Sequence, residues 1–99
     1  MNLSIRQLQC FREVMRSGSI SEAARTLGRT QPAVSAMIAS LEEELGLTLF
    51  ERQRGRLIRK PEAQYFLQET ELILERLAHS ARVMQEVGDL QQGKLRIAC

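Results

Sequence analysis

Three arginines with alternate spacing, Arg52, Arg54 and Arg56, are the side chains in this sequence best suited to binding an anion. Guanidinium groups pair with phosphate oxygens through charge-assisted hydrogen bonds. Between Arg52 and Lys60 the sequence carries five positive charges and no acid. A run of charge is usually only a solvated surface, so its meaning depends on the elements that stand beside it.

A second group of candidates precedes and opens a predicted helix. Gln31 can hydrogen-bond an adenine edge and Ser35 can reach a base or a phosphate, whereas Ala36 offers only apolar contact, for instance to a thymine methyl group. Thr30 stands at the helix N-terminus, which attracts anions. For Ser35 and Ala39, plain helix surface is an equally good interpretation. The candidate contact residues of this segment are Arg29, Thr30, Gln31, Pro32, Ser35, Ala36 and Ala39.

No constellation in the sequence suits catalysis. The single histidine, His79, follows Glu75 by four residues on a predicted helix, where a surface pair is expected rather than general-base chemistry. The sequence has no glycine-rich phosphate loop and no Cys/His cluster that could hold a metal. The acids of "LEEEL" occupy successive positions of one helix and cannot converge on a substrate. We therefore expect neither an enzyme nor a metal site.

Size and composition fit one small domain without a membrane span. The chain has 99 residues, and no apolar run approaches the roughly 18 residues that a span needs. Its N-terminus alternates polar and apolar residues and is not a secretory signal. Cys10 and Cys99 lie far apart, and Cys10 is predicted to pack as a small apolar residue rather than to form a disulfide. We expect a cytoplasmic protein.

Charge is distributed unevenly along the chain. Residues 1–60 carry ten basic residues against six acids, a net charge of +4, whereas residues 61–99 carry four basic residues against six acids, a net charge of −2. This asymmetry indicates that a polyanion binds the front half.

The elements that position the candidates can be read from "SISEAARTLGRTQPAVS". Ser19 followed three residues later by Glu22 is a capping box, so a helix begins there and ends at Gly28, which suits a left-handed stop. Thr30 can cap a second helix, whose first turn tolerates proline. Because the residue before proline disfavours the helical region, Gln31 is the alternative boundary. The two short helices form a helix-turn-helix.

A third amphipathic helix, roughly Ile5 to Ser17, precedes the pair and completes a small core. The apolar residues that recur at helical spacing and would face inward are Leu8, Phe11, Val14, Met15, Ala23, Ala24, Leu27, Val34, Met37, Ile38 and Leu41. A plain three-helix bundle that binds nothing would satisfy the same pattern, so these residues alone leave that alternative open.

The segment after the third helix favours binding. Apolar pairs at Leu49-Phe50 and Leu57-Ile58 flank Arg54-Gly55, which predicts a β-hairpin, although Arg-Gly is a weaker turn signal than Asn-Gly. This hairpin, residues 52–60, is called the wing. A basic hairpin beside a helix-turn-helix is the arrangement of a winged helix whose wing touches phosphates. We therefore predict DNA binding, with Arg54 reaching toward a minor groove or its flanking phosphates.

The motifs "GSISEAA", "TQPAVS", "LEEELG" and "LFER", in this order and spacing, resemble the N-terminal domain of LysR-type bacterial transcriptional regulators over nearly the whole chain. The resemblance implies a mainly α fold, a winged helix-turn-helix of three helices and a two-stranded wing, followed by a long dimerisation helix. It implies a homodimer on paired half-sites, with helix 31–45 in the major groove and the wing on the backbone or minor groove. It also implies a C-terminal domain that binds a small-molecule effector, so no cofactor is expected in this fragment.

The same resemblance predicts three segments and a weak direct readout of bases. Residues 1–60 would be the DNA-binding domain, residues 61–91 the linker helix, and residues 92–99, with "GKLRIAC" as a strand, the start of the effector domain. Ala36 stands where relatives often have Arg, and Ala39 occupies another frequently polar position. We therefore expect more of the specificity to come from DNA shape and from the dimer's paired sites.

The segment from Glu62 to Val87 contains neither Gly nor Pro and predicts one continuous helix, on the order of 40 Å long. Its apolar stripe needs a partner helix, which we expect to be the same helix of a second copy, antiparallel or crossed, in a homodimer. The full-length protein is expected to form tetramers. Two alternatives stay open: a helix that folds back as one more bundle member, and a dimeric helical adaptor that binds protein through the face of Ala36 and Ala39. The predicted dimerisation residues are Phe66, Leu67, Ile73, Leu74, Leu77, Ala81 and Met84.

Overall fold

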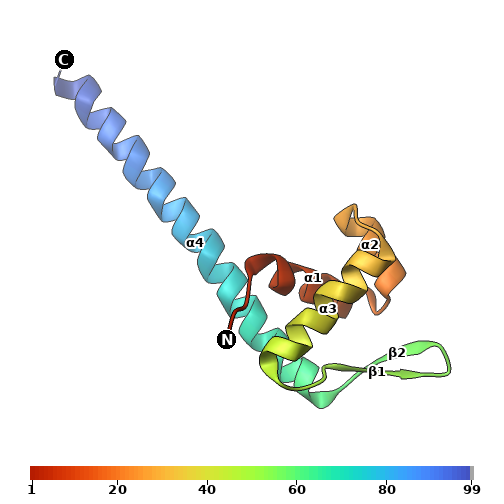
Figure 1. The fold of residues 1–99 in the computed structure, drawn as a ribbon. Helices are drawn as coiled ribbons and strands as arrows, with labels where there is room; N and C mark the ends of the chain where they lie inside the picture. The colour runs from red at the N-terminus through yellow and green to blue at the C-terminus, as the bar shows by residue number, and fades with distance from the viewer. Residues whose placement is uncertain (99) are drawn as a thin grey trace.

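The chain folds into helices and one β-hairpin, from which a single long helix projects (Figure 1). The structure is a computed structural model that describes the backbone of residues 1–98 and the side chains of residues 1–92. Its mainly helical architecture confirms the predicted winged helix-turn-helix followed by a long helix. The elements are α1 (Ile5–Ser17), α2 (Ile20–Leu27), α3 (Gln31–Leu45), β1 (Phe50–Gln53), β2 (Arg56–Arg59) and α4 (Pro61–Ala98).

Capping side chains fix where α1 and α2 begin. A complete capping box opens α1: Ser4 Oγ accepts from the Gln7 N–H at 3.2 Å, and Gln7 Oε1 accepts from the Ser4 N–H at 2.8 Å. At α2 only half of the predicted capping box forms, because Ser19 Oγ accepts from the Glu22 N–H at 3.3 Å while the Glu22 carboxylate lies 3.5 Å from the Arg25 guanidinium. The carboxylate therefore pairs along its own helix instead of returning to the cap.

The turn between α2 and α3 is the sharp corner that the sequence predicts. Gly28 ends α2 in the left-handed region, with φ of +65°. Thr30 caps α3, and its Oγ1 accepts from the Ala33 N–H at 3.3 Å. The first helical residue is Gln31, and Pro32 in the first turn lacks only an N–H that no carbonyl of the helix would receive.

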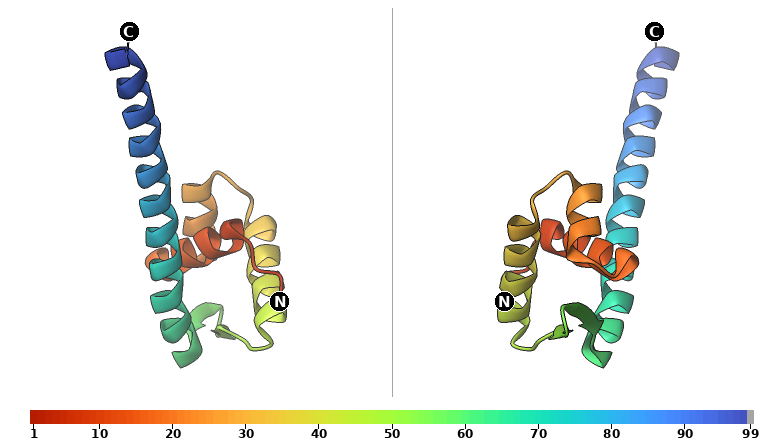
Figure 2. Two further views of the ribbon diagram at one scale, coloured as in Figure 1. Left: turned by 90° about the vertical axis from the view of Figure 1, so that its left-hand side faces the viewer. Right: turned by 90° about the vertical axis from the view of Figure 1, so that its right-hand side faces the viewer.

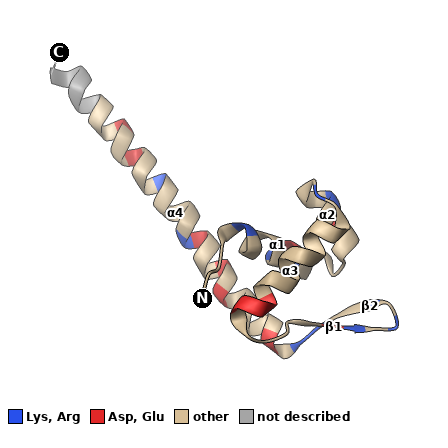
Figure 3. Cartoon of the chain, in the orientation of Figure 1, with Lys and Arg blue, Asp and Glu red and all other residues tan. Residues whose placement is uncertain are grey.

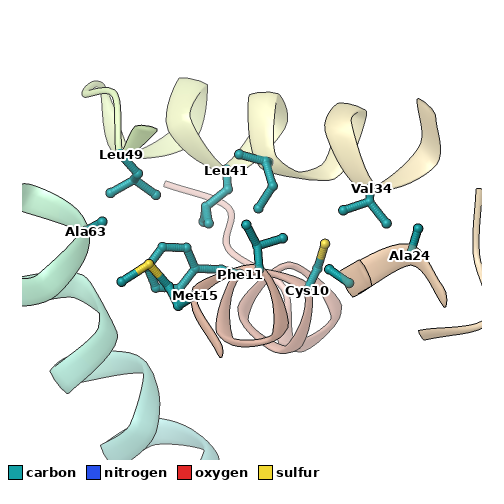
Figure 4. Close-up of a cluster of buried hydrophobic side chains, with 11 residues drawn as sticks. Cys10, Phe11, Met15, Ala24, Val34, Leu41, Leu49 and Ala63 are labelled. Carbon is teal, nitrogen blue, oxygen red and sulfur yellow. The ribbon is translucent and has the colours of Figure 1, made fainter. Parts of the chain in front are cut away.

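The core lies where α1 crosses the other elements (Figure 4). Phe11 is fully buried. The centroid of its ring lies 5.9 Å from the ring centroid of Phe50 and 5.1 Å from that of Phe66, and both pairs have the tilted arrangement that aromatic rings prefer. The core thus joins the wing and α4 to the three-helix unit. The buried cluster consists of Cys10, Phe11, Val14, Met15, Ala23, Ala24, Val34, Ile38, Leu41, Leu49 and Ala63.

The wing is an antiparallel hairpin that extends away from the core (Figure 1). Its first strand begins at Phe50, within the apolar pair that predicts the hairpin, and Gln53 pairs with Arg56 across the turn. The two turn residues both have positive φ, +51° at Arg54 and +76° at Gly55, as in the type I′ turns that suit two-residue hairpins. The left-handed conformation costs a non-glycine residue about 1 kcal/mol or more.

The long helix α4 has 38 residues, so it extends about 57 Å, and only its first part packs on the rest of the chain (Figure 2). Ala63 and Thr70 are fully buried, and Leu74 is 6% exposed. Glu71 lies 4.0 Å from Arg12 and 3.9 Å from Arg16, which adds two weak ion pairs between α4 and α1. None of the helices within residues 1–98 is long and apolar enough to cross a membrane.

Three of the predicted dimerisation residues have a different place in the structure. Phe66 and Leu67 are half-buried against the core of their own chain, and Leu74 is buried as well. Helical periodicity predicts that a face is covered but does not say by what, and here α1 covers the first part of the stripe. The prediction that the whole stripe lacks intramolecular partners is therefore wrong for its first part.

The C-terminal segment also differs from its prediction. Gly93–Ala98, expected to be a strand, continues the α4 helix. A strand needs hydrogen-bond partners on a neighbouring strand, whereas a helix satisfies its N–H and C=O groups along its own axis. Cys99 lies outside the described residues, and the division into segments 1–60, 61–91 and 92–99 stays a prediction.

Gly18 closes α1 under two constraints, and we expect Gly18→Ala to destabilise the fold by about 2–3 kcal/mol. Its φ is +73°, and a Cβ there would meet Arg59 Nη2 at 3.0 Å, displacing a guanidinium that donates to the Met15 carbonyl at 2.7 Å. Gly28→Ala is the matched control, since φ is +65° but a Cβ would have nothing within 4 Å. Urea unfolding should show the larger loss at position 18; equal losses would contradict the role of Arg59.

Candidate nucleic-acid interface

The predicted contact residues of α3 share one side of the helix, which faces solvent. The exposed members are Gln31, Pro32, Ala36 and Ala39, and Ser35 is half-buried. The buried residues on the other side are Val34, Ile38 and Leu41. Among the five contact residues, only Gln31 carries a long hydrogen-bonding side chain, so direct contacts to base edges would be few.

The first turns of α3 and the wing enclose an open cleft of about 510 Å³, called here the wing cleft. Gln31 and Ser35 line it from α3, and Arg52 and Arg56 line it from the wing. The structure therefore brings together four candidates that are some twenty residues apart in sequence. A smaller hollow of about 260 Å³ continues along α3 past Ala39, again beside Arg52.

The start of α2 forms the remaining wall of the wing cleft, which the sequence analysis missed. Ser19, Ile20 and Ser21 line the cleft beside Gln31. The first N–H groups of a helix lack partners within the helix and carry a partial positive charge, so they attract anions. Capping patterns reveal that a helix begins at this point, but only the folded chain shows that its N-terminus opens into the cleft.

The five cations of the wing divide into two groups. Arg59 Nη2 donates to the Met15 carbonyl at 2.7 Å, and Lys60 Nζ donates to Thr48 Oγ1 at 2.6 Å and lies 3.5 Å from Glu62. These two side chains hold the base of the hairpin. Arg52, Arg54 and Arg56 are exposed and form no ion pair with any side chain of residues 1–92, so they remain available to an anion.

Two further candidates stand just before α3. Arg29 and Thr30 are exposed in the turn, and the Thr30 hydroxyl is already the N-terminal cap of α3. Behind them, burial raises the pKa of the Cys10 thiol, and the charge of Arg29 acts in the opposite direction. The thiol is a member of the core and contributes no group to the wing cleft.

Basic residues of the wing and acidic residues of α3 lie at different places on the molecule (Figure 3). Lys and Arg lie along the wing and on α2, while acids gather at the C-terminal end of α3, where Glu42, Glu43 and Glu44 follow one another. No acid stands in the first turn of α3. A polyanion is therefore attracted to the wing and the N-terminus of α3 and is repelled from the opposite end of that helix.

A second surface runs along the free part of α4. Beyond Leu74, every described residue of α4 is exposed, including the predicted dimerisation residues Leu77, Ala81 and Met84; Ile73 is 40% exposed. An apolar stripe of this length is unusual on a monomer and indicates a protein partner. Further exposed apolar residues of α4, outside the predicted dimerisation set, are Leu72, Val83, Val87 and Leu90.

Comparison with known families and proteins agrees with this geometry. Residues 5–63 match the family described as bacterial regulatory helix-turn-helix proteins, lysR family. The regulatory protein NocR of Agrobacterium tumefaciens (strain T37) is 40% identical over 94 residues, which cover 95% of this chain and 31% of NocR. The transcriptional activator protein LysR of Escherichia coli (strain K12) is 37% identical over 100 residues, which cover 98% of this chain and 31% of LysR.

The fold is also similar to that of solved proteins. The crystal structure of the CbnR_DBD–DNA complex has a TM-score of 0.83 and 28% sequence identity, and the match covers 87% of this chain and 99% of that one. Against the curated relatives NocR and LysR the chain spans only 31% of their length.

Proposed function

The chain belongs to the lysR family of bacterial regulatory helix-turn-helix proteins, and from this premise we propose that it recognises double-stranded DNA as a transcriptional regulator. The observation that carries the proposal is the wing cleft, in which Gln31 of α3 faces the unpaired cations Arg52 and Arg56 of the wing. The relatives NocR and LysR are regulators rather than enzymes, which supports it, as does the DNA complex among the similar structures.

In this proposal α3 enters the major groove by its N-terminal half. Gln31 and Ser35 then reach base edges, while Pro32, Ala36 and Ala39 lie close enough for apolar contact. The sugar-phosphate backbone follows the wing cleft, between the N-terminus of α2 and the arginines of the wing. Arg54, at the tip of the hairpin, reaches the minor groove or the phosphates beside it. Arg29 and Thr30 contribute further phosphate contacts.

The DNA-bound form is proposed to be a homodimer through the free part of α4. The exposed apolar stripe includes Ile73, Leu77, Ala81 and Met84, and a second copy of the same helix, antiparallel or crossed, offers a matching stripe. A twofold pair presents two copies of α3 at a fixed separation, so the duplex carries paired half-sites. Tetramers would arise in the full-length protein.

The remaining predictions concern the whole regulator. We propose that residues 1–60 bind DNA and that residues 61–91 form the linker helix. Residues 92–99 would lead into a further domain that binds a small-molecule effector. The DNA-binding part then needs no cofactor of its own. The proposed setting is the cytoplasm, where bacterial DNA lies.

The test is selection of bound duplexes from a random DNA pool, followed by gel shifts titrated with salt. A recovered motif with two related half-sites and a steep loss of affinity with salt supports the proposal, because each neutralised phosphate adds about 0.9 to the slope of log K against log salt. Absence of binding at a salt concentration of about 50 mM would overturn the proposal. It would favour the alternative hypothesis, a dimeric helical adaptor that binds protein.

Arg54→Ala should weaken binding to all duplexes alike, by about tenfold, and lower the salt slope by about one. The side chain stands on an exposed two-residue turn and contacts a phosphate or its groove edge rather than one base. Arg82→Ala is the matched control, since it removes the same charge from an exposed site far along α4. A salt slope that stays the same in the Arg54 variant would remove this residue from the backbone contacts.

A further inference from the structure

One side chain ties the end of α3 to the start of the wing. The carboxylate of Glu42 accepts from the Leu49 N–H at 2.6 Å and from the Phe50 N–H at 3.3 Å. Its main-chain carbonyl also accepts from the Gly46 N–H at 2.9 Å and from the Leu47 N–H at 3.2 Å. Glu42 therefore accepts hydrogen bonds from Gly46, Leu47 and Leu49 of the connection between α3 and β1, and from Phe50 at the start of β1.

The bonded segment is also the base of the hairpin. Leu49 is fully buried, so its N–H has no access to water and depends on the Glu42 carboxylate. The Leu49 carbonyl accepts from the Lys60 N–H at 2.9 Å, which joins the two ends of the wing. Hydrogen bonds to a carboxylate are about twice as strong as those between neutral groups. A displacement of Glu42 would thus move both strands together.

We propose that Glu42 is a positioning residue for DNA recognition, which fixes the wing relative to α3 so that Arg54 and Gln31 engage the same duplex. This inference rests on the proposed function. Glu42 follows Gln31 by eleven residues, about 16 Å along the helix axis, and it carries the same charge as a phosphate. It acts on DNA through the wing and not by its own contact.

A second bond makes the role of Glu42 testable without loss of the fold. On the other strand Arg59 Nη2 donates to the Met15 carbonyl at 2.7 Å, and this bond does not involve Glu42. The ring centroids of Phe11 and Phe50 lie 5.9 Å apart, a second contact between the wing and α1 that does not involve Glu42. The wing then keeps its attachment to α1 and loses its direct tie to α3.

The first experiment measures amide hydrogen exchange in the free protein. In Glu42→Ala the amides of β1 and β2 should exchange about tenfold faster or more, while the buried amides of α1 change by less than about twofold. Glu42→Gln, which keeps one acceptor oxygen, should restore part of the protection and serves in place of the alanine variant if that one does not fold. Glu43→Gln is the control, because Glu43 is exposed and its side chain makes no hydrogen bond within residues 1–92.

The second experiment is a double-mutant cycle on a duplex recovered from the random pool. Arg54→Ala should cost about tenfold in affinity in the wild-type background but less than about threefold in the Glu42→Ala background. A loss of overall stability alone would leave the two factors equal.

The two failures can be told apart. If the wild type binds DNA, either of two results would overturn this inference and leave the proposed function intact. In the first, Arg54→Ala costs the same factor in affinity in both backgrounds; in the second, amide exchange in the wing is the same in Glu42→Ala as in the wild type. A wild type that binds no duplex at a salt concentration of about 50 mM would overturn the proposed function and the inference together.

Discussion

A chain carrying both Leu77→Asp and Met84→Asp is expected to be a monomer that binds a two-half-site duplex at least about 100-fold more weakly than the wild type. Leu77 is 47% exposed and Met84 is 65% exposed on the part of α4 that no other element of the described chain covers. In the proposed dimer these side chains are buried against a second copy. An unpaired carboxylate there costs several kcal/mol, so the two helices separate.

Light scattering measures the mass, and gel shifts on duplexes with one and two half-sites measure the affinity. On a single half-site the variant should bind as weakly as one wild-type subunit would. The matched control is Ala78→Asp with Gln85→Asp, which adds the same charges one position further on, about 100° around the helix. Leu74 is not used, because it is 6% exposed within its own chain and aspartate there would disturb the fold. A variant with an unchanged dimer mass would refute the α4 interface.

Gln31→Ala is expected to cost about 1–3 kcal/mol of binding free energy per site and to relax the preference for one base pair in each half-site. Among the predicted contact residues of α3, Gln31 is the one with a long hydrogen-bonding side chain, and it lines the wing cleft. A bidentate amide–adenine contact has no substitute from Pro32, Ala36 or Ala39 beside it. Selection from the random pool should therefore return a motif with one degenerate position per half-site.

The salt slope should distinguish Gln31→Ala from Arg54→Ala. A neutral side chain neutralises no phosphate, so the slope stays that of the wild type while affinity falls. Gln9→Ala, at an exposed position of α1, controls for loss of an amide elsewhere. An unchanged motif after Gln31→Ala would mean that this residue lies outside the major groove.

The helix boundaries were largely predictable, because local signals set them. Gly28 and Gly46 both end helices with positive φ, and Thr30 caps α3 at the predicted boundary. The capping box at Ser4 was missed, although its serine and the glutamine three residues later match the pattern. The turn at Arg54-Gly55 was also predictable, since an apolar pair stands on each side of it.

The features that the sequence could not predict are contacts between segments far apart in the chain. The wing cleft joins Ser19 at the start of α2 to Arg52 in the wing, and the sequence pattern carries no signal for that proximity. The hydrogen bond that the Leu49 N–H donates to the Glu42 carboxylate depends on how the chain leaves α3, whereas "LEEEL" predicts only a run of surface acids. Likewise, the period of α4 marks Phe66 and Leu77 equally, although only the first reaches the core.

The packing of α1 against the first turns of α4 makes those turns a stiff lever arm. From Pro61 to Leu77 the arm is about 24 Å long. The DNA-contacting unit of α3 and the wing, called here the head, moves with the Pro61 end of the arm. If two such arms cross near Leu77, a change of about 10° in their crossing angle shifts one head relative to the other by about 4 Å, slightly more than one base-pair step. Small changes in the crossing angle of the two α4 helices would therefore select among operators that differ in the spacing of their half-sites.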